Sequence, residues 1–456
     1  MLIAVLPVAT KIFIFVVPDC SDGPMGKISK RDFLKASGIA AASIAGCLGG
    51  NDQLTFWWID GDSTEYQDLN DWIEETVEAD TERQLEITGY AYSDLHQNVL
   101  TGGRQGTPDV IEGVIEHPGD YVAADIIEPL TDRTDEIPHF NGFLESALDA
   151  FRFQDELWAL PYTGNGRAIV YNKEVLAEYG YEDGPPSEID EFMELAGTIN
   201  ADYDDMNGFH LTTERGEVRA TQEFLSHVYQ HTDGSLYEWD GDGWALQADS
   251  DVFEAILGDI YYRLFHGDQP TASSAYQSAG YETNDIGFTE GEHAMIHCGP
   301  WINGFRDTDA QAEMLDEKVA VSLLPKHADA SDATYMEVKP AMINTHSNDL
   351  ESALSVASTF TSPETIERMG EINSGTVATP VHEDVESTLE NEDYMAFIDA
   401  FENGVAPAPI AWGPVREGIY DAIEYVIFDE QTPAEAANEL EQTLEEANVE
   451  LNPNEE

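Results

Sequence analysis

The sequence is 456 residues long and carries 90 Asp and Glu against 20 Lys and Arg, a formal net charge of −70 at pH 7. This length allows two or three domains with substantial cores, and a content of 42% hydrophobic residues excludes a disordered acidic polymer. The negative charge excludes both nucleic-acid binding through a basic face and electrostatic attachment to an anionic membrane surface.

The excess of acidic residues also predicts the salt in which the protein works. Repulsion among so many carboxylates destabilises a compact chain at low salt, whereas multimolar salt shortens the Debye length to about 3 Å or less and screens it. Lysines are scarce, since only Lys173, Lys318, Lys326 and Lys339 follow Cys47. We therefore predict a protein of an extreme halophile, a haloarchaeon. Pairs of carboxylates arise by chance in such a chain, so they do not argue for acid–base catalysis.

The first 47 residues hold five basic and three acidic residues, whereas the rest of the chain holds 15 and 87. A basic segment at 29–35 precedes a short apolar run at 36–46, which is the order of a signal peptide. The basic segment resembles the twin-arginine export motif with Lys30 in place of the first arginine, and SIAGC at 43–47 resembles a lipobox that ends at Cys47. A short transmembrane anchor is the alternative, although the run falls short of the ~20 residues that a span needs.

A second apolar stretch precedes this signal, and two signals in series have no evident use. Met25 lies four residues before the basic segment, so we expect translation to start there and residues 1–24 not to be translated. The three cysteines are Cys20, Cys47 and Cys298, and the first two belong to the processed or lipidated segment. An exported chain with Cys298 alone has no intrachain disulfide framework, so its stability must come from packing.

Strand-like and helix-like segments alternate beyond residue 53, which predicts an α/β fold. Short strands are expected at 54–59, 85–89, 109–111, 168–171, 294–297 and 319–324. Helical spacing of apolar residues predicts helices after Ser63 or Thr64 as N-cap, from Ser187, and after Thr432. Thr432 and Glu435 have the form of a capping box with proline at the first helical position, and a long amphipathic helix is expected there.

Motifs of several common catalytic classes are absent from the sequence: G-x-S-x-G, G-x-x-x-x-G-K-[ST] and H-E-x-x-H. His293, His297 and Cys298 suggest a metal site, but residues four apart on a strand are about 13 Å apart and cannot share one ion. A buried strand is the better interpretation. A serine or cysteine nucleophile with a histidine partner stays open, although nothing singles one out. We predict a protein that is not an enzyme and holds no metal or cofactor.

Aromatic and polar residues adjoin in four neighbourhoods, at 57–62, 158–165, 301–303 and 412–416. A sugar has apolar C–H faces and a rim of hydroxyls, so its site needs flat aromatic rings beside acid, amide or arginine groups. These neighbourhoods meet that description. The alternative for each tryptophan is packing in the core.

Several sequence blocks follow the order found in one protein family. They are WIDGD at 58–62, GTPDVI at 106–111, GDY at 119–121, IIEPL at 126–130, LWALPY at 157–162, IVYNK at 169–173, FTEGEHAM at 288–295, GPW at 299–301, SGTVATP at 374–380 and WGPVR at 412–416. Through these blocks, residues 54–447 resemble the extracellular solute-binding proteins of carbohydrate ABC importers, the group that contains maltose-binding and glucose-binding proteins.

The resemblance implies an α/β fold of the type II periplasmic-binding-protein class, in which crossing hinge strands join two lobes around a ligand cleft. It assigns residues 48–163 and 326–385 to the N-terminal lobe, and 164–325 and 386–456 to the C-terminal lobe. It implies a receptor at the outer face of the membrane, anchored by a lipid on Cys47. This receptor would capture a mono- or oligosaccharide as a monomer and deliver it to the permease subunits of the importer.

The same resemblance implies a set of ligand contacts at strand ends and in the loops near the hinge. They are Trp58, Asp60, Asp62, Glu112, Glu116, His117, Tyr162, Asn165, Arg167, Trp301, Asn303 and Trp412. The chain departs from maltose-type proteins at Gly113, where they stack a tryptophan, and at Ser63, where they place a lysine. These departures argue against a maltodextrin subsite pattern, and the doubled Trp57-Trp58 looks more like the glucose-binding branch.

Each of these residues also has a plainer explanation. Trp57 and Trp58 alternate on a strand, so one faces the core and the other the cleft, and we predict Trp58 for the cleft. For Trp301, which follows Gly-Pro at an element boundary, we predict an exposed platform. Asp60 and Asp62 could equally be charges at a helix N-terminus. Glu116 and His117 could equally lie on the solvated surface, and Arg167 could form a salt bridge in the hinge.

Two other functions stay open at this point. A secreted glycoside hydrolase needs two carboxylates at a set separation around a sugar. A receptor for a non-sugar solute, such as a polyamine, iron or a phosphate derivative, would share the fold. A cleft rich in tryptophan and poor in lysine argues against anions, whereas its carboxylates leave cations open.

Overall fold

The computed structural model describes residues 53–451, apart from residues 60, 233, 242, 374, 376 and 390. The predicted signal segment, with Cys47, lies outside the described residues, and so does Asp60. Within the described part of the chain, no helix combines the length and the hydropathy that a membrane span requires.

A six-stranded sheet gathers strands from distant parts of the chain. Its strands are β1 (Gln53–Ile59), β2 (Gln84–Tyr90), β3 (Val110–Glu112), β6 (Leu160–Gly166), β13 (Thr334–Ile343) and β14 (Gly404–Val405). They lie in the order β14-β13-β3-β1-β2, with β6 paired to β13. Strand β1 runs parallel to β2 and β3, whereas β13 runs antiparallel to β3 and β6. Alternate side chains of β1, those of Leu54, Phe56 and Trp58, are buried, as the two-residue period of a strand requires.

The second of the two larger sheets has four strands. Its strands are β7 (Ala168–Asn172), β8 (Asn207–His210), β11 (His293–Cys298) and β12 (Val319–Ser322), in the order β12-β7-β11-β8. Every residue of β7 and β11 is buried, which fits central strands covered on both faces. His293 and His297 therefore lie on a buried strand, as predicted, and Cys298 is a buried free thiol.

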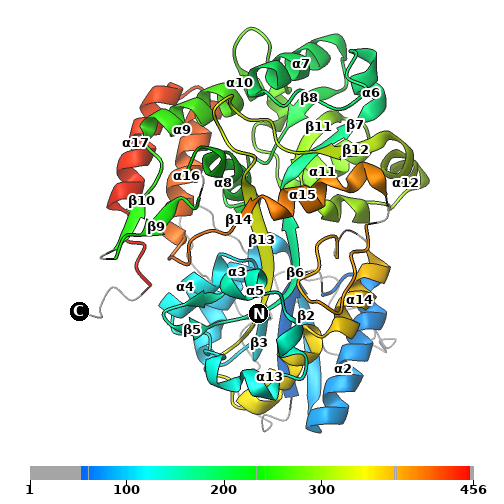
Figure 1. Cartoon of the computed structure of the whole chain (residues 1–456), viewed down its shortest axis with the longest axis vertical. Helices are drawn as coiled ribbons and strands as arrows, with labels where there is room; N and C mark the ends of the chain where they lie inside the picture. The colour runs from blue at the N-terminus through cyan, green and yellow to red at the C-terminus, as the bar shows by residue number, and fades with distance from the viewer. Residues whose placement is uncertain are drawn as a thin grey trace, which may run out of the picture. The chain divides into compact units, whose positions relative to one another are not determined.

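Helices cover both sheets and form a separate group beside them (Figure 1). Around the six-stranded sheet lie α2 (Gln67–Thr81), α3 (Tyr92–Gly102), α4 (His117–Ala123), α5 (Glu145–Asp149), α13 (Leu350–Phe360) and α14 (Pro363–Ile372). With the four-stranded sheet come α6 (Lys173–Glu178), α7 (Ile189–Asp202), α11 (Tyr281–Thr289) and α12 (Asp309–Glu313). The third group contains α8 (Val218–Thr232), α9 (Ser250–Ile256), α10 (Arg263–Phe265), α16 (Gly413–Ile427) and α17 (Pro433–Glu446).

Short elements complete the fold. The hairpins are β4 (Arg152–Phe153) with β5 (Glu156–Leu157), and β9 (Tyr237–Trp239) with β10 (Trp244–Leu246). The 3-10 turns are η1 (Thr64–Tyr66), η2 (Gly103–Gln105), η3 (Thr131–Glu136), η4 (Phe140–Gly142), η6 (Ser274–Tyr276), η7 (Pro300–Gly304) and η9 (Glu392–Tyr394). Two π-helical turns are η5 (Leu257–Tyr262) and η8 (Met314–Lys318).

The predicted helix starts are confirmed at one end of the chain and corrected at the other. The capping box before α17 is present, because Thr432 Oγ1 accepts from the Glu435 N–H at 3.3 Å and Glu435 Oε2 accepts from the Thr432 N–H at 3.1 Å. Of the two residues predicted as N-cap, Ser63 is the N-cap of the η1 turn, although its hydroxyl makes no capping bond. The turn leads into α2, which begins only at Gln67 with Tyr66 as its N-cap. The helix expected from Ser187 begins at Ile189 as α7.

The chain crosses between the two larger sheets beside the strand pair β6 and β13, which run side by side through the centre of Figure 1. Strand β6 belongs to the six-stranded sheet and continues through Arg167 directly into β7 of the other sheet. The chain returns from β12 to β13, and α15 (Ala396–Glu402) contacts β6, β7, β12 and β13 at the same junction. Because of these crossings, side chains from 165–167 and 335–339 stand where the two sheets meet.

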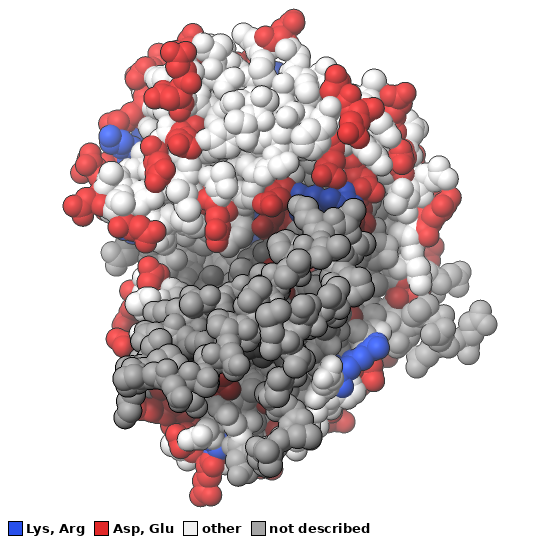
Figure 2. Space-filling model, turned by 180° about the vertical axis from the view of Figure 1, so that it is seen from behind, with Lys and Arg blue, Asp and Glu red and all other residues white. Residues whose placement is uncertain are grey.

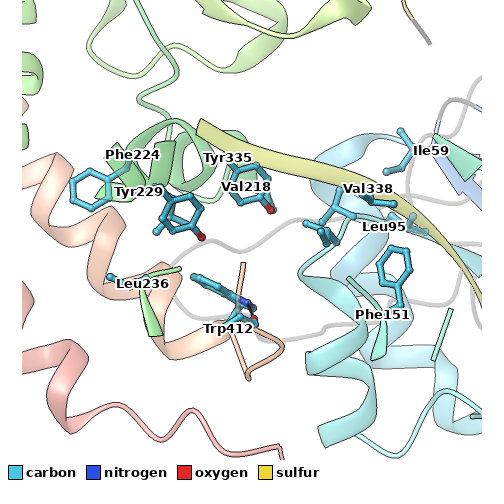
Figure 3. Packing of buried hydrophobic residues seen from close by; sticks show 14 of the residues in the cluster. Ile59, Leu95, Phe151, Val218, Phe224, Tyr229, Leu236, Tyr335, Val338 and Trp412 are labelled. Atoms are coloured by element: carbon cyan, nitrogen blue, oxygen red, sulfur yellow. Dashed lines mark hydrogen bonds between the residues drawn. The ribbon is translucent and has the colours of Figure 1, made fainter. Parts of the chain in front are cut away.

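Two clusters of buried hydrophobic residues hold the described chain together. Figure 3 shows part of the larger cluster, in which Trp412, Tyr229 and Tyr335 lie together with aliphatic side chains. On the face seen in Figure 2, Asp and Glu are scattered over the described surface and Lys and Arg are few.

Candidate ligand-binding site

A cavity of about 380 Å³ lies where elements of the two larger sheets meet, and this volume is typical of small-molecule sites. From the six-stranded sheet and its surroundings it is lined by Trp58, Ile59, Ser63, Glu65, Tyr66, Tyr162, Thr163, Asn165, Glu337, Lys339, Met369, Asn373 and Gly375. From the β6–β7 crossing, α8, α11 and the segment after β11 it is lined by Arg167, Arg219, Gln222, Tyr281, Glu282, Pro300, Trp301, Gly304, Phe305 and Asp307. Aromatic rings and charged groups thus face one enclosed space from two walls.

The two walls touch at the rim of this cavity. Gly375 lies against the carbonyl oxygen of Pro300, and Gly304 lies against the side-chain amide of Asn373. A β-carbon at either glycine would collide with these atoms. Glycine at both positions therefore permits the close approach of the two walls.

Trp301 forms a platform on one wall. Its η7 turn follows β11 directly, because Gly299 is extended and Pro300 occupies the first position of the turn. The indole Nε1–H donates to Asp285 Oδ2 at 2.9 Å. The guanidinium carbons of Arg167 and Arg219 lie 4.5 Å and 5.2 Å from the ring centroid, within reach of a cation–π interaction. The half-buried ring is therefore fixed at its edge while it lines the cavity.

Each nitrogen of Arg219 has a protein acceptor. It donates to both oxygens of Asp285 at 2.9 Å and 2.8 Å, to Glu223 at 2.6 Å and to the carbonyl of His297 at 2.5 Å. Burial raises the pKa of Glu223, although the positive charge of Arg219 and the Thr212 N–H oppose this shift. Arg219 therefore connects α8, α11 and β11, and two carboxylates lie beside its charge.

Arg167 has a different balance of partners. Its terminal nitrogens donate to the side-chain oxygens of Asn165 and Gln222, and Glu337 lies 3.5 Å away. Its Nε atom is buried and has no hydrogen-bond partner among the described residues. Such an atom normally finds an acceptor, and in a cavity-lining residue a ligand or a water can supply one.

Glu337 lies beneath Arg167 and ties the floor of the cavity together. It accepts from the Ile115 N–H at 3.0 Å and from Gln222 Nε2 at 2.9 Å. Burial raises the pKa of this carboxyl to about 7, against the lowering effect of Arg167 and Lys339. The floor therefore carries a carboxyl group that changes its charge near neutral pH.

Tyr162 and Lys339 share a buried carboxylate below the cavity. Glu112 Oε1 accepts from the Tyr162 hydroxyl at 2.7 Å and lies 3.5 Å from Lys339 Nζ, and Oε2 accepts from the Ile59 N–H at 3.0 Å. Glu112 is fully buried and is not among the residues that line the cavity. It orients two lining side chains from behind.

A second cluster of charges lies away from the cavity, around the start of α16. Arg416 donates to Glu116 Oε2 at 2.7 Å and also to Asp120, which in turn accepts from the Trp412 N–H at 3.0 Å. The Tyr335 hydroxyl donates to Glu116 Oε1 at 2.9 Å. None of these residues lines the cavity. We call Arg416, Glu116 and Asp120 the rear cluster.

The predicted site residues divide into three groups. Trp58, Tyr162, Asn165, Arg167 and Trp301 line one cavity. Glu112, Glu116, His117, Asp62, Asn303 and Trp412 do not line it. Asp60 is not described. The role of all twelve in ligand binding stays a prediction.

The residues of the second group are engaged elsewhere. His117 stacks on His96 with ring centroids 4.4 Å apart, and burial lowers its pKa well below the usual range. Asp62 accepts from the Gly89 N–H at 3.0 Å, and Asn303 accepts from Arg306. The Trp412 ring is fully buried and donates to the carbonyl of Ala408 at 2.9 Å.

Sequence reasoning missed several lining residues, notably Arg219, Gln222, Glu337 and Lys339. The signal that could have identified the basic ones among them is the scarcity of Lys and Arg in the sequence. A chain with so few basic residues places Arg167, Arg219 and Lys339 around one cavity. Among the described residues, no group of three or more His, Cys, Asp or Glu is arranged to hold a metal ion.

Sequence comparison finds a family and a distant relative. The model of the family described as bacterial extracellular solute-binding protein matches residues 60–367, more than half of the chain. The diacetylchitobiose binding protein DasA of Streptomyces coelicolor is 28% identical over 196 residues. That match covers 38% of this chain and 44% of DasA, so it spans less than half of the relative.

Structure comparison finds solved proteins of the same fold. Maltose-bound MalE3 of T. maritima has a TM-score of 0.73 at 19% identity, over 86% of this chain and 99% of that one. The GacH receptor of Streptomyces glaucescens gives 0.72 at 18% identity, over 87% and 99%. The maltotriose binding protein of Thermus thermophilus gives 0.68 at 19% identity, over 86% and 100%. The predicted α/β fold of periplasmic binding proteins is thereby confirmed, and the chain belongs to the bacterial extracellular solute-binding protein family.

Proposed function

We propose that this protein is the sugar receptor of an ABC importer, which captures a mono- or oligosaccharide outside the cell and delivers it to the permease. The observation that carries the proposal is the cavity lined by Trp58 and Trp301 together with the side chains of Arg167, Asn165 and Lys339. Flat rings suit the C–H faces of a sugar, and directed polar groups suit its hydroxyls. The relatives support it, since they bind maltose, maltotriose and diacetylchitobiose.

In the proposed mechanism the protein performs no chemistry. A sugar that contacts both walls of the cavity favours their closed arrangement by its higher affinity for that arrangement. The moving bodies would be residues 48–163 with 326–385 and residues 164–325 with 386–456, hinged at the β6–β7 and β12–β13 crossings. The closed form docks on the permease, and a lipid on Cys47 keeps the receptor at the outer face of the membrane.

The charges of the cavity favour a neutral ligand over an anion. An anionic group needs uncompensated positive charge, and here the charge of Arg219 is paired with the buried carboxylates Asp285 and Glu223. Arg167 lies 3.5 Å from Glu337, and Lys339 lies 3.5 Å from Glu112. Because each cation of the cavity has a carboxylate beside it, the site offers an anion little uncompensated positive charge.

A cationic solute is the second candidate. Glu65, Glu282 and Asp307 stand exposed at the rim of the cavity and form no ion pair among the described residues. Three unpaired carboxylates around an aromatic cavity would also suit a polyamine. The same residues fit the general excess of acid on the surface, so the sugar is the stronger proposal.

The test is a thermal-shift screen of the mature protein in multimolar KCl against mono- and oligosaccharides, with polyamines and metal salts as controls. A sugar at 100 times its dissociation constant adds about 2.7 kcal/mol to the free energy of unfolding, so the melting temperature should rise with sugar concentration. The sugar should be recovered unchanged. Stabilisation by polyamines alone would replace the sugar with a cation, and new reducing ends would indicate a glycoside hydrolase.

A further inference from the structure

We propose that Asp285 is a positioning residue for ligand binding, which holds the Trp301 ring at the angle that a sugar needs. The inference rests on the proposed function, because Trp301 is its sugar platform. Asp285 lies on α11, is fully buried and does not line the cavity. It would therefore act on a ligand only through the side chains that it holds.

Both oxygens of Asp285 are used on the platform and its support. Oδ2 accepts from the Trp301 Nε1–H at 2.9 Å and from Arg219 Nη1 at 2.8 Å. Oδ1 accepts from Arg219 Nη1 at 2.9 Å and from the Cys298 thiol at 3.4 Å. One carboxylate thus connects the edge of the ring, the arginine next to it and the last residue of β11.

Arg219 supplies the second support of the ring. Its guanidinium carbon lies 5.2 Å from the Trp301 centroid, and it is itself fixed by Glu223 at 2.6 Å and by the His297 carbonyl at 2.5 Å. A hydrogen bond at the edge and a neighbouring cation together restrict rotation about both side-chain dihedrals of the tryptophan. A platform that is ordered before binding spares the entropy of ordering it later.

The rear cluster shows that a buried Asp–Arg pair does not by itself imply such a role. Asp120 also accepts from a buried arginine, Arg416, and its other oxygen accepts from a backbone N–H. Neither Asp120 nor Arg416 lines the cavity. Asp120 is therefore the matched control, because its loss disturbs a buried ion pair of the same kind without touching the platform.

The experiment compares Asp285→Asn with Asp120→Asn in the mature protein labelled with ¹⁵N-tryptophan. The Trp301 indole resonance is identified by its loss in Trp301→Phe. In Asp285→Asn the resonance should shift and broaden, because the charged acceptor is gone and Arg219 competes for the one remaining oxygen. Asp120→Asn should leave it in place. This readout needs no ligand, so it decides the positioning role even if the protein binds no sugar.

Sugar affinity supplies the second readout, with maltotriose and diacetylchitobiose as probes. Asp285→Asn should weaken binding about ten-fold or more, and Asp120→Asn less than two-fold. Trp301→Phe, which keeps the Asp–Arg pair, should weaken binding several-fold in the wild-type background and add little in the Asp285→Asn background. An unchanged Trp301 resonance in Asp285→Asn, or an equal loss of affinity in Asp120→Asn, would overturn the proposal. If neither these two sugars nor any sugar of the thermal-shift screen binds the wild type, the proposed function fails and the resonance result stands.

Discussion

Two buried arginines, Arg219 and Arg416, show how one arrangement serves two purposes. Each lies between two carboxylates, with side-chain exposures of 3% and 7%. Arg219 lies next to the Trp301 ring and lines the cavity. Arg416 joins the start of α16 to Glu116 and Asp120 at α4, next to the buried ring of Trp412. The first fixes a side chain that lines the cavity, and the second joins two packed elements.

The comparison also shows what a buried charge cluster says about function. Burial raises the pKa of Glu116, whereas that of Asp120 falls to about 2, because Arg416 and His96 outweigh the opposing effect of burial. Asp120 therefore contributes stability above its unfolded pKa that is lost as the pH falls toward 2. Perturbed groups gather in binding sites, but structural ion pairs perturb them as well. The cavity beside Arg219, rather than the charge of Arg219, is what makes this region the candidate binding site.

The largest expected effect is on stability, at the rear cluster. Arg416→Met leaves Glu116 and Asp120 buried without their cation, so the free energy of unfolding should fall by about 3–5 kcal/mol. Chemical denaturation in multimolar KCl measures this change. Arg215→Met is the control, because Arg215 meets three carboxylates at the surface and its loss should cost about 1 kcal/mol or less. Equal losses in the two variants would show that the rear cluster is no stronger than a surface network.

The next largest effect distinguishes the roles of Trp301 and Trp412. Trp412→Ala removes a fully buried ring and should lower the free energy of unfolding by about 3–5 kcal/mol. Trp301→Ala should change stability less and raise the dissociation constant for sugar by roughly 10- to 100-fold, since it removes an apolar contact of about 1.5–3 kcal/mol. Calorimetric titration and denaturation of both variants check this. Unchanged affinity in Trp301→Ala would remove Trp301 from the site.

The helices and strands of this fold could be predicted where the pattern of neighbouring residues determines them. Strand β1 shows the period of two, and α17 has its capping box, because both depend on neighbouring residues. Trp58, Tyr162 and Trp301 were also predicted, and all three line the cavity: Trp58 and Tyr162 lie within β1 and β6, and Trp301 follows β11. The start of α2 was not predicted correctly, because the chain there enters α2 through a 3-10 turn.

The sequence did not show how deeply each predicted side chain is buried. Glu116 and Trp412 were both predicted as ligand contacts but are buried and do not line the cavity. Glu116 pairs with Arg416, 300 positions away in the sequence. No local pattern shows such a contact. Glu337 and Lys339 were missed although they alternate with apolar residues on β13, which places both on one face of the strand. Two charges on one face of a buried strand were a readable signal.

The smallest expected effect is the pH dependence at the floor of the cavity, where Glu337 also binds a buried arginine. Its pKa, raised to about 7 by burial, means that the folded protein holds this proton at pH values where the unfolded chain has lost it. The stability from the protonated form is full below the unfolded pKa and is lost as the pH rises through 7. Between pH 6 and 8 the free energy of unfolding should fall by about 1 kcal/mol from this group.

Glu337→Gln tests this because glutamine keeps the size of the protonated acid and cannot ionise. Its stability relative to the wild type should increase between pH 6 and 8, as measured by denaturation at constant multimolar salt. Glu282→Gln, which removes an exposed carboxylate from the rim of the same cavity, should follow the wild-type curve. A constant difference between Glu337→Gln and the wild type would mean that Arg167 and Lys339 keep Glu337 charged across this range. The floor of the cavity would then be a permanent ion pair, like the rear cluster, and sugar binding would lack this source of pH dependence.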